Sequence, residues 1–409
     1  MKSVDEHLKE ALDAVEPLAA YDMQLLEAHD TLLAQDVVAT RDLPRFDNSA
    51  MDGYAVRASD LVDASDERPV TLPVVGDIAA GSYLTMSIRP GYTARIMTGA
   101  PLPAGSDAVV PQEWTDHGIA AVQIRQAPSV GQHVRCRGED VEAGTTVLKA
   151  GSRLTARQIG LLAALGHDRV LARPRPRVVV LSTGSELVEP GAAVGPAQIT
   201  DSNSFLLASA AREAGAVAYR VGLVPDDPRI LMDAIEDQFI RADLIVTSGG
   251  VSVGTYDVVK EVLAKLGTVR FTKVAMQPGM PQGFGVIGPD ETPIFTLPGN
   301  PVSCYVSFEI FVRPVLRKLA GQDPVGLPIV KATCTSKFSS PEGKRQYARA
   351  RLTQRDNGTF AAEPLGGGVG SHLMGDLADA NALIVVPEQT KTVLAGTRVD
   401  VMVLERRST

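Results

Sequence analysis

The chain has 409 residues, a formal net charge of −8, a hydrophobic fraction of 44% and a charged fraction of 22%. This composition is typical of a soluble globular protein with several domains, and its acidic balance argues against general nucleic-acid binding. No apolar run could span a membrane, no secretory apolar region opens the chain, and the 3 cysteines form no metal-binding pair, so we expect a cytoplasmic protein.

The first 41 residues favour helices. The sequence SVDEHLKEAL, residues 3–12, has Ser3 and Glu6 at the spacing of a capping box. MQLLEAHDTLLAQDV, residues 23–37, repeats apolar positions at intervals of three and four. TARQIGLLAALG, residues 155–166, predicts another helix that ends at a glycine. We expect these segments to pack together as one helical domain, with a β-rich module inserted between them.

That module contains short strand-like runs, VTLPVVGDI, TARIMTG and DAVVPQEW, separated by glycine and proline turns. Two stretches in and beside it are dense in polar side chains: PRFDNSAMDGYAVR at 44–57 and RCRGED at 135–140. Each stretch has two possible explanations. The first is explained equally well by turn-forming residues or by a functional site, and the second by a surface cluster of ion pairs or by a functional site.

The rest of the chain predicts two further kinds of fold. Strand-like and helix-like segments alternate from Arg177 to Gly321, which predicts a parallel, doubly wound α/β sheet; the strands are RVVVLS, AYRVGLV, ADLIVTS and PIFTLP. Residues 322–409 contain only strand-like runs and predict a small β-barrel or sandwich.

Ligands bind outside the carboxyl ends of the strands in a parallel sheet. The strand exits here read STGSE, VPDDP, TSGGVSVGTYD and LPGNPVS. The glycine-rich loop suits an anion, and acids on three exits are the hard oxygen ligands that Mg²⁺ takes. Other roles remain open: Asp226 or Asp227 is the N-cap of the helix that begins at Pro228, and Glu186 and Asp257 interact with helix dipoles. LPGNPVS is an ordinary turn or, as we favour, a ligand contact.

Six motifs together resemble one protein family. DNSAMDGYAV, RIMTGAPLPAGSDAVV, RGED, STGSEL, SGGVSVGTYD and LPGNPVS occur in order along nearly the whole chain. They are similar to those of the MoeA-type molybdopterin molybdenumtransferases, which are related to the E domain of gephyrin. The resemblance implies insertion of molybdate into adenylylated molybdopterin with release of AMP, dependent on Mg²⁺.

The resemblance also implies a multidomain fold and an assembly. The expected parts are a discontinuous helical domain at 1–41 and 148–172, a β-rich inserted domain at 42–147, a molybdopterin-binding α/β domain at 173–321 and a C-terminal β-barrel at 322–409. Such proteins resemble elongated homodimers, with a site between the α/β domain of one subunit and the β-rich domain of the other. The implied partners are adenylylated molybdopterin, molybdate and the upstream and downstream enzymes of the cofactor, with no nucleic acid and no membrane.

The family's site residues map onto matching positions of this sequence. The implied catalytic residues are Asp52, Asp140, Glu186, Asp226 and Asp257. The last three are also the implied metal ligands. The implied substrate-binding residues are Thr98, Arg135, Ser248, Gly249, Gly250, Ser252, Gly254, Lys273, Pro298, Gly299, Asn300, Pro301 and Ser371.

The sequence departs from the family pattern mainly by losing charge. Gln277 and Met280 stand where several relatives carry lysines, Cys136 where an arginine is common and Ser185 where an aspartate is frequent. Either other basic residues compensate for the lost charge, or the affinity for the ligand differs. The candidates for compensation are Lys344, Arg345, Arg349 and Arg351. The alternative is that these four residues form a solvated face. Two alternative functions are a molybdopterin adenylyltransferase and a gephyrin-like scaffold.

Overall fold

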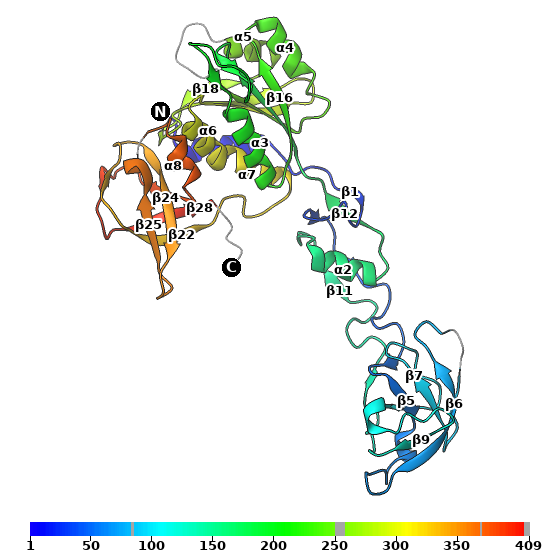
Figure 1. The fold of residues 1–409 in the computed structure, drawn as a ribbon. Helices are drawn as coiled ribbons and strands as arrows, with labels where there is room; N and C mark the ends of the chain where they lie inside the picture. Colours follow the sequence, from blue (N-terminus) through cyan, green and yellow to red (C-terminus); the bar gives the residue numbers. More distant parts are fainter. Residues whose placement is uncertain (83–85, 250–257, 369, 405–409) are drawn as a thin grey trace. The chain divides into compact units, whose positions relative to one another are not determined.

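The computed structural model describes residues 1–82, 86–249, 258–368 and 370–404 (Figure 1). The chain divides into two compact units. Unit 1 consists of Met1–Tyr21, Asp30–Leu32 and Ala172–Thr409, and unit 2 of Asp22–His29 and Leu33–Leu171. Within the described ranges, no helix is both long and apolar enough to cross a membrane.

A six-stranded sheet is the centre of unit 1. Its order is β16 (Val217–Val224), β13 (Arg177–Thr183), β17 (Leu244–Ser248), β21 (Thr292–Leu297), β20 (Pro281–Ile287) and β18 (Arg270–Lys273). The first four strands are parallel, as the sequence predicts. β20 is antiparallel to β21, and β18 is antiparallel to β20. The expectation of an all-parallel sheet is therefore wrong for this edge.

Strand β20, one of the two unpredicted strands, contains glycines that look like loop residues but let neighbouring segments approach closely. A Cβ atom on Gly285 would lie 2.3 Å from the Thr268 carbonyl oxygen, and one on Gly283 would lie 2.9 Å from the Phe271 ring. Glycine in a strand often marks such an approach. The glycines that make β20 hard to predict from sequence are thus required by its close packing.

Helices cover both faces of this sheet, which makes the α/β part doubly wound (Figure 1). One face packs against α1 (Val4–Asp13), α3 (Asn203–Glu213), α6 (Pro301–Ser307) and α7 (Arg313–Leu319). The other face packs against α4 (Pro228–Glu236) and α5 (Val258–Leu266). The side chains of β13 alternate between the two cores, with Val178 and Val180 in one and Val179 and Leu181 in the other. A π-helical turn, η3 (Phe308–Val312), joins α6 to α7.

A closed five-stranded barrel forms the C-terminal part of unit 1. Its strands follow the order β24 (Arg345–Gln354), β25 (Phe360–Pro364), β22 (Ile329–Cys334), β28 (Arg398–Val403) and β26 (Ala382–Val386), and β24 pairs with β26 to close it. The barrel has its own core. Of the two predicted alternatives, barrel and sandwich, the barrel is correct. β19 (Met276–Gln277) runs parallel to β24 and links the barrel to the segment after β18.

Unit 2 is mainly β-structure. A five-stranded sheet has the order β8 (Ala108–Pro111), β5 (Gly53–Val56), β7 (Thr93–Ile96), β6 (Val70–Ile78) and β9 (Ala121–Ile124). β4 (Asn48–Ser49) pairs with β10 (Val134–Arg135), and β3 (Val37–Val38) pairs with β11 (Thr146–Leu148). The predicted helix at 155–166 is α2 (Ala156–Ala164), and Gly166 after it has a φ of 83°. The strand-rich insert that the sequence predicts is confirmed.

The N-terminal segment differs from its prediction in two ways. The capping box of α1 is present, because the Ser3 hydroxyl accepts from the Glu6 N–H and the Glu6 side chain accepts from the Ser3 N–H. However, α1 buries Val4 and Ala11 in the core of unit 1, whereas α2 belongs to unit 2. The two helices therefore belong to different units rather than to the one helical domain that we expect from the sequence.

Residues 23–37 do not form the helix that their spacing predicts. They contain the end of β1 (Tyr21–Gln24), a run of turns and β2 (Leu32–Leu33). Met23, Ala28 and Leu33 are buried, but Leu26 is 85% exposed. A three-and-four spacing of apolar residues also fits a short strand followed by turns when one of those residues faces solvent. β1 and β2 pair with β12 (Arg169–Arg173) in a small sheet where the chain changes unit.

Candidate active site

The strand topology of unit 1 brings most of the predicted site to one edge of the sheet. β16, β13, β17 and β21 are parallel, and β18 runs in the same direction because two antiparallel pairings separate it from β21. The carboxyl ends of these strands therefore share an edge. Glu186 follows β13, Asp226 follows β16 and Ser248 ends β17; Lys273 ends β18, and residues 298–301 follow β21.

The two acids after β16 have separate roles. Asp227 is the N-cap of α4, and its carboxylate accepts from the backbone N–H groups of Arg229 at 2.9 Å and Ile230 at 3.1 Å. Asp226 does not cap the helix. One of its oxygens, Oδ2, accepts from the Ser185 N–H at 3.0 Å and from the Ser185 hydroxyl at 3.3 Å. The open choice between the two acids is thus settled, and Asp226 is the acid that faces the loop after β13.

Glu186 lies beside this contact and is exposed. Its carboxylate folds back over Gly184, where an added Cβ atom would lie 2.8 Å from Oε2. Within the described ranges, neither Glu186 nor Asp226 forms an ion pair, and no group of three His, Cys, Asp or Glu residues could hold a metal ion there. Asp257, the third predicted ligand, lies outside the described residues.

The start of the glycine-rich loop approaches the neighbouring strand exits closely. Ser248 is buried, and the Gly249 N–H donates to the Leu297 carbonyl at 3.0 Å. Gly249 has a φ of 95°, and a Cβ atom there would lie 3.1 Å from the Thr183 carbonyl oxygen. A Cβ atom on Gly299 would lie 3.9 Å from the Gly249 Cα atom. Gly250, Ser252 and Gly254 lie, like Asp257, outside the described residues.

The turn after β21 joins the α/β part to the barrel part of the same unit. Asn300 precedes α6 and donates from its amide to the Ser371 hydroxyl at 3.2 Å. The Val302 N–H donates to the Ser371 carbonyl at 3.1 Å. Pro298 and Pro301 flank this turn. Ser371, predicted only through resemblance, therefore contacts the turn that strand topology predicts.

One contact of this turn involves a residue that the sequence reading missed. The side-chain amide of Asn203, at the start of α3, donates to the Gly299 carbonyl at 2.7 Å. The run of polar residues just before α3 was the available signal.

A small pocket of about 10 Å³ lies between the turn and the barrel, with room for about one water molecule. Its lining residues are Gln277, Pro278, Val302, Tyr347, Arg349, Gly370 and Ser371. The Arg349 guanidinium is almost fully buried and donates to the carbonyls of Gly370 at 2.9 Å and Leu373 at 3.0 Å. Burial lowers the pKa of Arg349, with Asp376 acting in the opposite direction. An arginine thus lines the same pocket as Gln277.

Arg349 lies 3.8 Å from Asp376, and two of the other candidate basic residues of the barrel also have acidic partners. Arg345 binds Asp5 at 2.7 Å and Glu388 at 3.0 Å, and Arg351 lies 3.5 Å from Asp379. Two residues that replace basic family residues make backbone contacts. The Met280 carbonyl accepts from the Val274 N–H at 2.8 Å, and the N–H of the exposed Cys136 donates to the Glu139 carboxylate at 2.8 Å. Of the four candidates, Arg349 is the one that lines the same pocket as Gln277, and the geometry favours it on that ground.

Unit 2 holds the remaining predicted residues. Asp52 Oδ1 accepts from the Thr98 N–H at 2.7 Å and from the Thr98 hydroxyl at 2.9 Å. These two donors, the N–H first, hold the pKa of Asp52 below its usual range. Arg135 in β10 pairs through its backbone with Asn48, only a few residues before Asp52. The structure thus brings three predicted site residues, Asp52, Thr98 and Arg135, into neighbouring segments.

The RCRGED stretch is partly a structural cluster. Arg137 forms an ion pair with Asp42, and its backbone N–H donates to Asp47 at 2.7 Å. Asp140 is exposed, and its backbone N–H donates to the Leu43 carbonyl at 2.9 Å. The ion-pair explanation therefore holds for Arg137, while the carboxylate of Asp140 is left at the surface.

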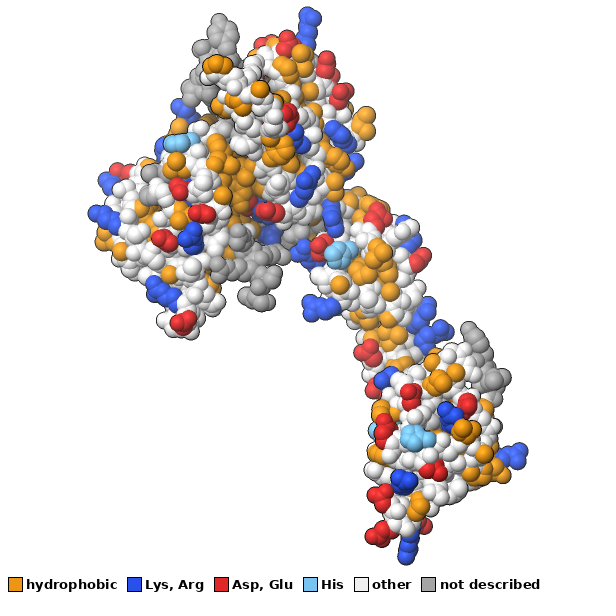
Figure 2. Space-filling view, in the orientation of Figure 1, with side chains coloured by type: hydrophobic (Ala, Val, Ile, Leu, Met, Phe, Trp, Pro, Cys, Tyr) orange, Lys and Arg blue, Asp and Glu red, His pale blue; other side chains and the backbone are white. Residues whose placement is uncertain are grey.

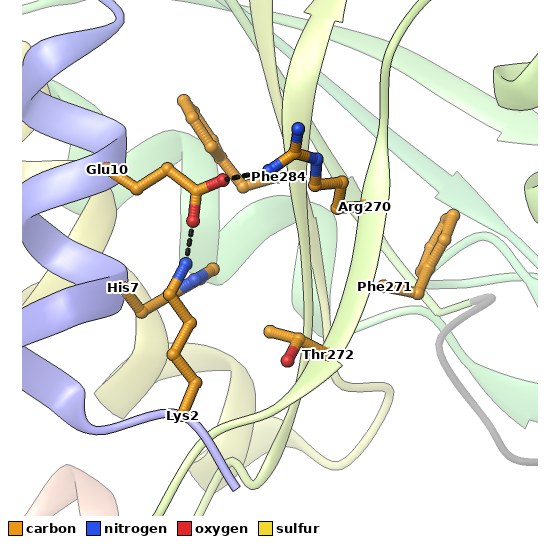
Figure 3. Close-up of a pocket in the computed structure, with 7 residues that line it drawn as sticks. All are labelled: Lys2, His7, Glu10, Arg270, Phe271, Thr272 and Phe284. Carbon is orange, nitrogen blue, oxygen red and sulfur yellow. Dashed lines mark hydrogen bonds and ion pairs between the residues drawn. The ribbon is translucent and has the colours of Figure 1, made fainter.

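A larger pocket of about 410 Å³ lies elsewhere in unit 1, between α1 and β18 (Figure 3). Lys2 and Arg270 line it, and both form ion pairs with Glu10 (Figure 3). The ring of His7 is buried beside it and packs edge-on against Phe311, with 4.7 Å between ring centroids. Burial, with a smaller effect of Lys2, lowers the pKa of His7 to about 4. None of the predicted site residues lines this pocket.

The surface offers no strong charge bias on the face shown in Figure 2. On both units, Lys and Arg side chains are interspersed with Asp and Glu side chains. On this face, a charged ligand would be held by local groups rather than by a broad region of one sign.

Family models match nearly the whole chain. Residues 2–166 match the MoeA N-terminal region (domain I and II), residues 179–318 match a probable molybdopterin binding domain, and residues 331–404 match the MoeA C-terminal region (domain IV).

Individual relatives agree with these matches. The chain is 46% identical to molybdopterin molybdenumtransferase 2 of Mycobacterium tuberculosis (strain CDC 1551 / Oshkosh), over 98% of this chain and 99% of the relative. It is 40% identical to molybdopterin molybdenumtransferase 1 of the same strain, over 99% of each. Its fold is similar to the crystal structure of a molybdopterin biosynthesis MoeA protein from Pyrococcus horikosii, with a TM-score of 0.80, 31% identity and 99% of each chain covered.

Proposed function

Because the chain belongs to the MoeA family of molybdopterin molybdenumtransferases, we propose that it inserts molybdate into adenylylated molybdopterin and releases AMP. The observation that carries this function is the shared strand edge, where Glu186, Asp226, Gly249 and the turn at 298–301 meet. Loop backbones that approach closely and two acids without ion pairs suit a phosphate-bearing ligand with its counter-ion.

The acids at this edge fit Mg²⁺. Asp226 uses one oxygen for Ser185 and keeps the other, and Glu186 is exposed beside it. Mg²⁺ commonly takes one or two protein carboxylates together with waters and substrate phosphates. Glu186 and Asp226 would hold the ion, joined in this proposal by Asp257. When bound, the ion supplies positive charge that stabilises the departing AMP phosphate.

The surface at the mouth of the small pocket between the turn and the barrel, which itself has room for about one water molecule, is the proposed place for molybdate. A tetrahedral dianion needs hydrogen-bond donors, and Ser371, Gln277 and Arg349 line this pocket together. Arg349 stays charged despite its burial, because a guanidinium is too basic to lose its proton in a protein. It supplies the positive charge that Gln277 lacks in place of a lysine. Lys273, at the end of β18, adds a second cation at the same edge.

We propose a homodimer in which this edge acts together with the partner's Asp52, Thr98, Arg135 and Asp140. The proposal rests on the family resemblance. Asp52 is already oriented by Thr98 within its own unit, so it can serve a site without rearranging. We further propose that the protein is cytoplasmic, since Cys136, Cys304 and Cys334 are all free thiols.

A turnover assay tests the proposed reaction. Purified protein is given adenylylated molybdopterin, molybdate and Mg²⁺, and AMP release is followed with and without each component. We expect molybdate-dependent AMP release that chelation of Mg²⁺ abolishes. Formation of adenylylated molybdopterin from ATP and molybdopterin would instead identify an adenylyltransferase, and no turnover of either kind would favour a scaffold.

A further inference from the structure

A buried carboxylate lies behind the strand edge, on the side of α3. Asp201 is 2% exposed and lies two residues before Asn203, the first residue of α3. Its Oδ1 accepts from the Ser182 hydroxyl at 3.1 Å and from the Ser204 N–H at 3.1 Å, and its Oδ2 accepts from the Ser204 hydroxyl. The nearest cation is Arg220, 3.8 Å from Oδ2, whose guanidinium binds Glu189 in a bidentate manner. Asp201 therefore relies chiefly on neutral donors.

Ser182 connects this carboxylate to the glycine-rich loop. Ser182 and Ser248 are paired in register on β13 and β17, and their hydroxyl oxygens lie 3.5 Å apart. The Ser182 hydroxyl donates to Asp201 Oδ1, so its single hydrogen points at Asp201. In the contact between the two serines, Ser248 must then be the donor. Ser248, the last residue before Gly249, is thus linked to Asp201 through Ser182, by a contact at the long limit of a hydrogen bond.

The same short segment reaches a second part of the site. Asn203 lies two residues after Asp201, and its amide donates to the Gly299 carbonyl at 2.7 Å. Residues 201–203 therefore contact the exit of β13 directly, the exit of β17 through Ser182, and the turn after β21. Asp201, Ser182 and Asn203 themselves are not among the residues expected to bind the substrate.

We propose that Asp201 is a positioning residue for substrate binding, acting through Ser182 on Ser248 and the start of the glycine-rich loop. The inference rests on the proposed function of this edge. It predicts that breaking the link at Ser182 weakens the binding of adenylylated molybdopterin. Breaking the link between Asp201 and the start of α3 should affect stability alone.

Two serines that share the same carboxylate form a matched pair for the test. Ser182→Ala removes the link to Ser248 and leaves both contacts of Asp201 with Ser204. Ser204→Ala removes a hydroxyl that contacts Asp201 but leaves the link through Ser182. Both changes replace a buried hydroxyl by hydrogen, so their general effects on packing are similar.

The measurements are kcat and KM for adenylylated molybdopterin, with the midpoint of thermal unfolding. For Ser182→Ala we expect KM to rise about three- to tenfold with kcat nearly unchanged, the range for a lost hydrogen bond. For Ser204→Ala we expect unchanged KM and a lower midpoint. Unchanged KM in Ser182→Ala, or equal KM changes in both variants, would overturn the inference while wild-type turnover upholds the function. Absence of wild-type turnover would refute the function itself.

Discussion

Asp226 in unit 1 and Asp52 in unit 2 are fixed by the same arrangement of hydrogen bonds. In each case one carboxylate oxygen accepts from both the N–H and the hydroxyl of a single Ser or Thr residue, and the second oxygen makes neither contact. The hold on Asp52 is tighter, at 2.7 and 2.9 Å against 3.0 and 3.3 Å for Asp226.

The difference in hydrogen-bond length follows from where the donor residue lies in each unit. Thr98 belongs to a turn directly after β7, so its donors are fixed by a sheet. Ser185 lies in the loop between β13 and β14 (Leu187–Val188), where the acid and its donor come from two different loops. Asp42, by contrast, is occupied by the Arg137 guanidinium and has no comparable freedom. Acids held by neutral donors keep their charge available to a ligand, whereas ion-paired acids have already used it.

The largest effect should come from removing Asp226, with Asp227 as the control beside it. We expect Asp226→Ala to lower AMP release at least about a hundredfold with little change in stability, because the carboxylate faces the strand edge and caps no helix. Asp227→Ala should cost about 1 kcal/mol of stability, through loss of the N-cap, and leave AMP release largely intact. AMP release and thermal unfolding of both variants decide; equal loss of activity in the two would contradict the division of roles.

Mixing variants tests whether the two held acids serve one site from different protomers. Asp52→Ala and Asp226→Ala should each be inactive alone. In a homodimer with shared sites, each mixed dimer has one intact site of two, so the purified mixed dimer should have about half of wild-type activity. Activity is measured after coexpression of differently tagged chains and purification through both tags. A mixed dimer as inactive as its parents would mean that both acids act within one chain.

Acid should weaken unit 1 before unit 2, because the buried His7 belongs to unit 1 alone. The pKa of His7 is about 4 in the folded protein, below the ordinary value of 6.5. The unfolded chain therefore binds the proton first, and stability falls as the pH drops from about 6.5 to 4. The full loss is about 3 kcal/mol.

The two units can be followed separately in this experiment. Trp114 is the single tryptophan of the chain and lies in unit 2, so its fluorescence reports that unit, while far-UV circular dichroism reports both. We expect the circular dichroism transition to move to lower denaturant between pH 6.5 and 4.5, and His7→Leu to lessen that movement. A circular dichroism shift of the same size in wild type and variant would count against the assignment to His7, whereas the Trp114 transition should be the same in both proteins.

The smallest effects on activity should come from removing the hydroxyl that donates to Asp52 or the one that donates to Asp226. Thr98→Val removes the hydroxyl but keeps the N–H, and we expect kcat/KM to fall roughly tenfold, as for a lost hydrogen bond to a charged group. Ser185→Ala should cost roughly threefold, because its longer hydroxyl contact is weaker. In Thr98→Val the pKa of Asp52 rises, so the acid limb of its pH–rate profile should move to higher pH. A larger fall in kcat/KM for Ser185→Ala than for Thr98→Val would contradict the prediction that the hydrogen bonds to Asp52 are the stronger ones.

Sequence pattern predicted the parts of this site that depend on local structure. The buried runs before STGSE, VPDDP, TSGG and LPGNP are β13, β16, β17 and β21, so their exits had to share an edge. The choice between Asp226 and Asp227 could not be made, because both precede Pro228 and either could cap α4. The distances to Ser185 on another loop decide it.

Contacts between distant segments were beyond the pattern. Asn300 and Ser371 are 71 positions apart, and Asp52 and Thr98 are 46 apart; only the family resemblance placed them in one site. The helix predicted at 23–37 failed because apolar spacing alone cannot show that Leu26 faces solvent. Strand β20 was missed because the close approaches that demand Gly283 and Gly285 involve segments elsewhere in the sequence.

The packing of α1 has a consequence for how the chain is made on the ribosome. Val4 and Ala11 of α1 share a core with Phe311 and Val315, so this helix is synthesised about 300 residues before its partners. At bacterial-type elongation rates of roughly 5–20 residues per second, the wait lasts roughly 15–60 s. Unit 2, complete by Leu171, can fold during that time, while the apolar face of α1 stays uncovered. The nascent N-terminus is therefore the segment for which a chaperone would have the longest opportunity to bind.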